Sequence, residues 1–236
     1  RQKWRGFAKQ FLKFSERLAV KFSSVVVADN EAIAKHVQSN YNAVCKTIAY
    51  GGDHACVDHK EKLMVDIPFK VEGYAFALCR IEPENNVHLI LEAFASASMN
   101  LIFVGNWQAS DYGCELIDRY SSIANMKLLD PIYNLDVLAM YRRNCRVYIH
   151  GHSAGGTNPS LVEMMHFEKP IIAFDCVYNR ATMEDKGQYF SSSSSLSKSI
   201  KTPECFEEGK ELGDIARRRY TWSVVRAQYH KLFDFK

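Results

Sequence analysis

Long apolar runs, paired cysteines and a marked excess of either charge sign are all missing from this 236-residue sequence. Because no apolar stretch reaches about 18 residues, no membrane-spanning helix is predicted. The seven cysteines are scattered without a CxxC pair, which argues against a zinc site or a disulfide framework and favours reduced thiols in a cytoplasmic protein. The net charge of +3 is too small to indicate a nucleic-acid partner. The sequence also has no initiating methionine, so we expect it to be the C-terminal part of a longer chain.

Residues 1–22 predict a basic amphipathic helix. Apolar side chains recur at the spacing of one helical face, and Glu16 is the only acid among seven lysines and arginines. The favoured interpretation is a helix that packs on a core and leaves its basic face in solvent. The alternative is peripheral contact with anionic lipid at the inner face of the plasma membrane. The apolar face comprises Trp4, Phe7, Phe11, Phe14, Leu18 and Phe22.

The rest of the sequence divides into regions of different pattern. Residues 1–50 are interpreted as the end of one α/β domain, residues 51–72 as a polar hinge, residues 73–218 as a second domain, and residues 219–236 as a closing helix. Within the second domain, short apolar strands alternate with helices, which predicts an α/β fold with a Rossmann-like, doubly wound parallel sheet. Such sheets bind ligands beyond the carboxyl ends of their strands. Five consecutive serines at 191–195 predict a flexible loop.

The segment Gly151–Met165 carries the strongest functional signal. A strand that ends near Ile149 runs into a loop of small residues, which then opens a helix. Gly155 and Gly156 permit positive φ, Thr157 or Asn158 suits an N-cap, and Pro159 suits the first helical position. A helix N-terminus at a strand end favours an anion. Since Glu163 adds an acceptor for sugar hydroxyls one turn later, the segment predicts a sugar-nucleotide site.

Two other strand ends contribute candidate residues. Arg80 follows the strand at 74–79 and is suited to a bidentate contact with phosphate. The loop after the strand at 126–129 is the candidate base reader, although a plain proline turn fits that loop equally well. The residues of the base reader are Leu129, Asp130, Pro131 and Ile132.

Two alternatives arise from single residues near the glycine loop. His150 and His152 form a His-x-His pair, but no third ligand lies at a useful spacing, so no metal site is predicted. Ser153 stands within a Gly-x-Ser-x-Gly pattern. A hydrolase with Ser153 as nucleophile is disfavoured, because a second glycine pair follows where that motif requires a helix.

Four blocks of this sequence resemble glycosyltransferase family 4, whose members have two facing Rossmann-like domains in the GT-B arrangement. The blocks are Tyr50–Asp53, Cys79–Asn86, Arg146–Pro170 and Tyr220–Trp222. The segments Arg80–Asn86 and Gly155–Glu163 look most like a subgroup of rhamnosyltransferases that use dTDP-rhamnose for bacterial surface polysaccharides. The resemblance implies a retaining hexosyltransferase that needs no cofactor and no metal, with the present chain as its donor-binding part.

The resemblance also implies a role for each site residue. Arg80 and Glu163 form the catalytic set: Arg80 holds the diphosphate and Glu163 the ribose. Asn85 stands at the position where the family usually has a lysine. Gly155 stands at the position of the first of the family's two paired glutamates, of which Glu163 is the second. The implied diphosphate contacts are Arg80, Asn85, Gly155, Gly156, Thr157, Asn158 and Pro159. The implied partners are a nucleotide sugar and a glycan or lipid-linked acceptor.

The two departures from the family pattern leave an alternative function open. They fit a deoxy-sugar donor that offers fewer hydroxyls, and they also fit a degenerate module that binds a nucleotide sugar without transferring it. Other GT-B enzymes are disfavoured. An epimerase would need carboxylates and a histidine in the first domain, and a phosphorylase would need a pyridoxal lysine; none of these is visible.

Overall fold

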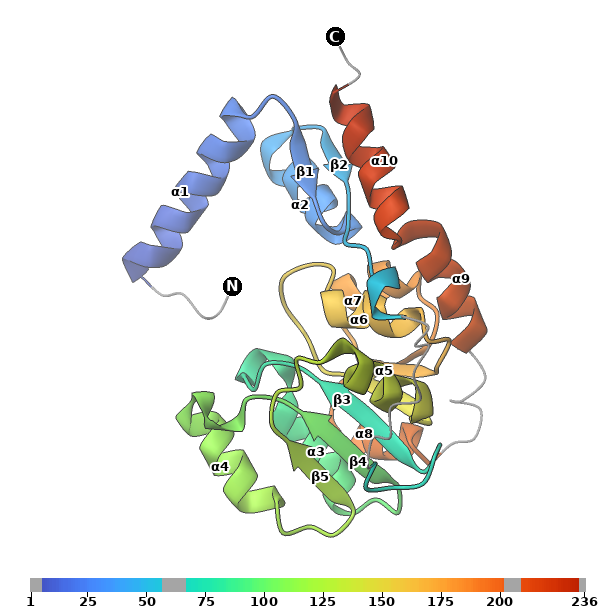
Figure 1. The fold of residues 1–236 in the computed structure, drawn as a ribbon. Helices are drawn as coiled ribbons and strands as arrows, with labels where there is room; N and C mark the ends of the chain where they lie inside the picture. Colours follow the sequence, from blue (N-terminus) through green and yellow to red (C-terminus); the bar gives the residue numbers. More distant parts are fainter. Residues whose placement is uncertain (1–5, 57–66, 202–208, 234–236) are drawn as a thin grey trace.

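The computed structural model describes residues 6–56, 67–201 and 209–233 of the chain (Figure 1). Trp4 and part of the predicted hinge, residues 57–66, lie outside the described residues. Within the described part, no helix combines the length and the apolar character that crossing a bilayer requires.

A six-stranded sheet forms the centre of the larger domain. Its order is β5-β4-β3-β6-β7-β8, and every neighbouring pair is parallel, which confirms the predicted fold class. The chain first builds outward from β3 through β4 to β5 (Figure 1) and then returns to β6 on the other side of β3. The direction in which successive strands are added to the sheet therefore reverses between β3 and β6. This position is the topological switch point at which such folds bind ligands. The strands are β3 (Tyr74–Leu78), β4 (Asn100–Val104), β5 (Met126–Leu129), β6 (Val147–His150), β7 (Ile171–Phe174) and β8 (Gln188–Phe190).

Helices cover both faces of this sheet because its strands are apolar on both sides. In β3, Ala75 and Ala77 pack into one buried cluster while Tyr74 and Phe76 pack into the other. The first cluster is closed by α3 (Val87–Ala95), α4 (Asp111–Tyr120) and α8 (Ser193–Ser199). The second is closed by α5 (Leu135–Asn144), α6 (Pro159–Met165), α7 (Val177–Met183) and α9 (Gly209–Arg219). Three 3-10 turns, η1 (Asp53–Ala55), η2 (Pro83–Asn85) and η3 (Trp107–Ala109), shape the connecting loops.

A smaller unit precedes the sheet in the chain. The parallel strands β1 (Val26–Ala28) and β2 (Cys45–Thr47) flank α2 (Glu31–Tyr41). The C-terminal helix α10 (Trp222–Phe233) continues from α9 and runs back alongside this unit (Figure 1).

The helix α1 (Gly6–Phe22) corrects one expectation. It projects away from the larger domain (Figure 1), and none of its residues is buried. The predicted apolar face is exposed: Phe7 by 82%, Phe14 by 58% and Phe22 by 75%. The amphipathic helix was therefore predicted correctly, but the favoured core-facing placement is not found, since no other part of the described chain covers that face.

The serine run also differs from its expectation. Residues 193–199 form α8 instead of a flexible loop. Ser192 caps the helix, and the side chain of Ser195 bonds back to the Ser192 backbone, which completes a capping box. Leu196 is fully buried beneath the helix. Capping and one apolar anchor thus outweigh the low helix propensity of serine.

Candidate functional site

The candidate site lies at the switch point of the sheet. The loop after β3 carries Arg80, and the loop after β6 begins at Gly151, on the neighbouring strand. Hydrogen bonds join the two loops: Asn86 Nδ2 donates to the Gly151 carbonyl over 2.8 Å, and Ser153 N donates to the Glu84 carbonyl over 3.1 Å. The fold therefore brings together the two segments that the sequence predicts as an anion site.

Arg80 is placed to meet a ligand from solvent. Its side chain is 71% exposed, and its nearest carboxylate contacts are 3.5 Å to Glu82 and 4.0 Å to Glu84. Ion pairs of this length at the surface contribute little. The guanidinium is therefore available for a bidentate contact with a diphosphate.

The glycine pair of the second loop adopts the conformation that the sequence predicts. Gly155 has φ of +108° and Gly156 has φ of +104°. Asn158 is the N-cap of α6, and its Oδ1 accepts from Ser160 N at 3.0 Å, with Pro159 in the first helical turn. Because α6 has seven residues and its N-terminal amide at Ser160 is already bonded, an anion here would depend on the loop amides before the cap and on Arg80.

Thr157 is held from the N-terminal unit. Its hydroxyl donates to the Asp29 carbonyl over 2.6 Å and accepts from Asn30 Nδ2 over 3.1 Å. Asn30 Nδ2 also lies 3.2 Å from the Tyr178 carbonyl and 3.2 Å from Thr182 Oγ1. The Thr157 hydroxyl is thus committed to the junction with the N-terminal unit, where it fixes the loop.

Asn85 has a supporting position. It is 3% exposed, its Nδ2 donates to the Arg80 carbonyl over 2.7 Å, and its Oδ1 lies 2.7 Å from His152 Nδ1. Both ends of the amide are engaged inside the protein. This geometry replaces the predicted direct diphosphate contact of Asn85 with a role in fixing the Arg80 backbone.

The alternatives at Ser153 and at the histidine pair gain no support. The Ser153 hydroxyl donates to the Glu84 carbonyl over 2.7 Å, so no histidine activates it. Burial lowers the pKa of His150 to about 3, and burial together with the Arg80 charge lowers the pKa of His152. Among the residues that the structure describes, no group of three potential metal ligands gathers.

Glu163 sits at the centre of a chain of polar contacts. Its Oε2 accepts from Nη2 of Arg142, and its Oε1 lies 3.4 Å from His54 Nε2. Trp222 Nε1 donates to His54 Nδ1 over 3.1 Å. An indole N–H can only donate, so Nδ1 of His54 is the acceptor and the proton on Nε2 faces Glu163. The carboxylate is 17% exposed and retains lone pairs for two hydroxyls of a pentose.

Sequence reasoning missed Arg142 and His54. Arg142 is 1% exposed but lies on an ordinary helix, with no local pattern to mark it. His54 directly follows Tyr50–Asp53, a block that belongs to the family resemblance but to which the resemblance assigns no site residue. A Cβ on Gly52 would lie 2.7 Å from the Glu163 backbone amide, so this glycine lets the turn lie directly against α6 and places His54 beside the carboxylate.

Part of the loop that was predicted to bind the base already makes hydrogen bonds within the protein. The Leu129 carbonyl accepts from Trp107 Nε1 and from Gly105 N, each over 3.0 Å, and both of its lone pairs are used. Asp130 is exposed, Pro131 and Ile132 are half-buried, and base contact by these three residues stays a prediction.

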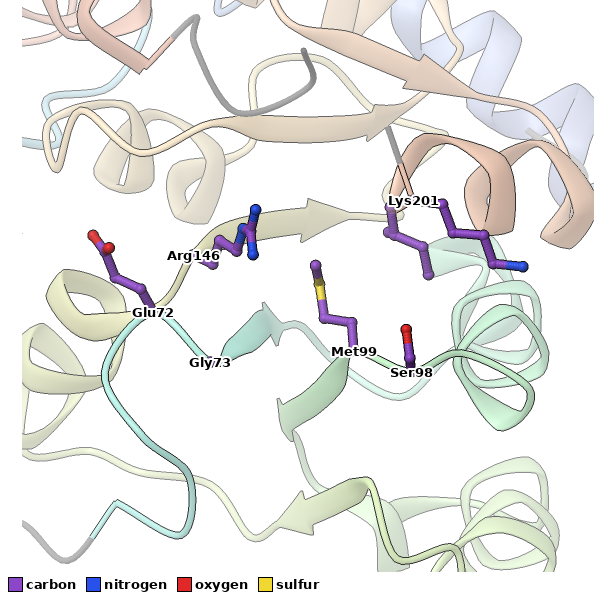
Figure 2. A pocket seen from close by; sticks show the side chains of 7 residues that line it. Glu72, Gly73, Ser98, Met99, Arg146 and Lys201 are labelled. Carbon is purple, nitrogen blue, oxygen red and sulfur yellow. The ribbon is translucent and has the colours of Figure 1, made fainter. Parts of the chain in front are cut away.

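A cavity of about 350 Å³ lies elsewhere, at the edge of the sheet where β3, β4 and β6 begin (Figure 2). Its wall includes Glu72, Met99, Arg146 and Lys201. It opens at Gly73, before β3, whereas Arg80 follows the other end of that strand, so the cavity is not part of the candidate site.

A Rossmann-like sheet with an arginine and a glycine loop at its switch point, facing a second α/β unit, is the architecture of GT-B glycosyltransferases. Solved structures of that class share the fold. HepE from Anabaena in complex with UDP is 18% identical, with a TM-score of 0.75 over 97% of this chain and 68% of HepE. Sucrose-phosphate synthase from Thermosynechococcus elongatus is 14% identical, with a TM-score of 0.76 over 99% of this chain and 62% of that protein.

The family follows from the sequence of the larger domain. Residues 60–201, more than half of the chain, match the family described as glycosyl transferases group 1, and the chain belongs to that family. Residues 1–53 match a domain of unknown function, DUF1972. No curated protein matches the chain.

Proposed function

We propose that this chain is the donor-binding part of an enzyme that transfers a sugar from a nucleoside diphosphate to a glycan or lipid-linked acceptor in surface-polysaccharide synthesis. The sugar that we propose is L-rhamnose. The transfer retains the anomeric configuration, as in family 4. The observation that carries the proposal is the placement of an exposed arginine and a double-glycine loop on neighbouring strand ends, with a fixed carboxylate one helical turn beyond.

Each residue has a defined task in the proposed reaction. Arg80 and the amides from Gly155 to Asn158 stabilise the charge that develops on the diphosphate as it leaves. Glu163, oriented by Arg142 and His54, accepts the hydroxyls of the ribose. Asn85 keeps the Arg80 backbone in place.

The choice of donor depends on what the loop lacks. No acidic side chain stands between Gly151 and Ser160, which suits a 6-deoxy sugar with fewer hydroxyls to hold. Two solved HepE complexes contain UDP and UDP-glucose. The donor experiments therefore include both thymidine and uridine nucleotides.

Calorimetric titration of the protein with dTDP, UDP, dTDP-L-rhamnose and UDP-glucose tests the donor site. We expect binding with preference for the thymidine pair. The full-length protein is then supplied with dTDP-L-rhamnose and a lipid-linked acceptor. Nucleotide binding without turnover would favour the degenerate binding module, and absence of binding to all four nucleotides would contradict the donor site itself.

The exposed face of α1 supports a second part of the proposal, peripheral contact with a lipid surface. Its aromatic side chains are uncovered, and Lys9, Lys13 and Arg17 stand among them in sequence, which is the pattern of an interfacial helix. Co-sedimentation with vesicles that contain anionic lipid tests it. We expect more binding than to neutral vesicles, and less after Phe11→Ser and Phe14→Ser; equal binding to both vesicle types would contradict the contact.

A further inference from the structure

Asp29 follows β1 and faces the glycine pair of the larger domain. Its Oδ2 accepts from the Tyr50 hydroxyl over 3.3 Å, and its backbone carbonyl accepts from Thr157. Its Oδ1 is shielded from solvent and accepts no well-formed hydrogen bond from the described residues, while the backbone amides of Asp29 and Thr157 lie beside the carboxyl and act to lower its pKa. One carboxylate oxygen is therefore anchored by Tyr50, and the other is only weakly held at the junction of the two units.

Asp29 Oδ1 lies directly against Gly156. A Cβ atom on Gly156 would overlap Asp29 Oδ1. Since the loop from Gly151 to Ser160 has no acid of its own, Asp29 brings a carboxylate to this loop from the other unit of the molecule.

The chemistry of a carboxylate limits what can satisfy it. Burial raises the pKa of the Asp29 carboxyl, and a buried acceptor without a well-formed hydrogen bond is destabilising until a donor reaches it. A carboxylate accepts hydrogen bonds but repels a phosphate. The group that fits beside the amides of a phosphate loop is thus a hydroxyl of the ligand portion attached to that phosphate.

We propose that Asp29, held by Tyr50, binds a hydroxyl group of the transferred sugar and so distinguishes the nucleotide sugar from the bare nucleotide. This inference rests on the proposed function. It assigns sugar recognition to a residue of the smaller unit, while Arg80 and Glu163 hold the nucleotide.

The test compares two affinities within each variant. Asp29→Asn and Asp29→Ala are titrated with dTDP and dTDP-L-rhamnose, and with UDP and UDP-glucose. Loss of a charge-assisted hydrogen bond raises the Kd for the preferred nucleotide sugar about tenfold or more, while the Kd for the matching nucleoside diphosphate changes less than about twofold. Tyr50→Phe, which leaves the carboxylate without its anchor, gives a smaller shift in the same direction. Asp118→Asn, an exposed aspartate on α4, is the matched control.

The outcomes separate the two proposals. Selective loss of sugar-nucleotide affinity in both Asp29 variants, with an unchanged Asp118 variant, supports the inference. Equal weakening of nucleotide and nucleotide sugar overturns it, because a carboxylate that only supports the loop would affect both ligands alike. Unchanged affinities overturn it as well. If the wild-type protein binds none of the four ligands, the proposed function fails, and this inference fails with it.

Discussion

Glu163 Oε2 accepts a hydrogen bond from Nη2 of Arg142, a guanidinium that is 1% exposed and whose Nε and Nη1 have no other partner among the described residues. The two ends of this ion pair are unequal, because the carboxylate also reaches His54 and some solvent. Removal of the Glu163 carboxylate therefore leaves the buried Arg142 charge without a partner, whereas removal of the guanidinium leaves a carboxylate that is still partly solvated.

The asymmetry predicts unequal costs in stability. Glu163→Ala should lower the free energy of unfolding by about 3–5 kcal/mol, and Arg142→Met by less than about half of that. The double variant Arg142→Met/Glu163→Leu should recover part of the loss, since an apolar pair of similar volume can replace a buried ion pair. Urea denaturation at neutral pH measures all three. Equal losses from the two single variants would show that the buried charge is satisfied by something else.

Arg80 should matter for binding and not for folding. Its side chain is 71% exposed with two long carboxylate contacts, so Arg80→Ala should leave the melting temperature unchanged. The Kd for dTDP should rise about tenfold or more as one charge-assisted contact is lost. Arg119→Ala, on an exposed position of α4, provides the control. A dTDP affinity that is the same in both variants would remove Arg80 from the site.

The two glycines of the loop should respond differently to a methyl group. Both have positive φ, but Gly155 has only His152 Nε2 at 3.8 Å from an added Cβ, while Gly156 would overlap Asp29. Gly155→Ala should cost about 1–3 kcal/mol of backbone strain. Gly156→Ala should cost more than that, because it also pushes the smaller unit away from the loop. Chemical denaturation of the matched pair checks the order; a larger loss at Gly155 would contradict the packing.

His150 should make stability depend on pH. Burial lowers its folded-state pKa to about 3 from an ordinary 6.5, so between these values the unfolded chain binds the extra proton and stability falls as the pH falls. His150→Phe should reduce this slope by up to about 1.4 kcal/mol per pH unit. Urea denaturation between pH 6.5 and pH 4 measures it, with the exposed His230→Phe as control. An unchanged slope in His150→Phe would mean that the folded protein takes up the proton at this site.

Much of the larger domain could be predicted because its strands are short apolar runs between turn residues. The strand at 126–129 has the predicted bounds, the strand predicted at 74–79 ends one residue earlier at Leu78, and the closing helix begins at Trp222 within the predicted 219–236. The helix α7 was missed, since Val177–Met183 has no side-chain cap and mixes buried polar residues such as Asn179 with apolar ones. Tertiary contacts, not local pattern, hold that helix.

The candidate site was predictable where function depends on the backbone and less so where it depends on distant partners. Positive φ at Gly155 and Gly156 follows from residue type alone, and of the two predicted caps, Thr157 and Asn158, the fold uses Asn158. The burial of Asn85 and the pairing of Arg142 with Glu163 arise from elements that meet only in the folded chain. The spacing of residues along the sequence does not indicate such contacts.

Asn30 has a consequence for how the two units of this molecule separate. Its fully buried side chain caps α2 and lies within hydrogen-bond distance of acceptors on Thr157, Tyr178 and Thr182. Separation of the two units would break all three contacts at once, although Thr182 Oγ1 would keep its hydrogen bond to the Tyr178 carbonyl over 2.8 Å. Because Asp29 Oδ1 is shielded from solvent at this junction, a ligand hydroxyl reaches it only as the two units move apart or from the exposed side of Gly155.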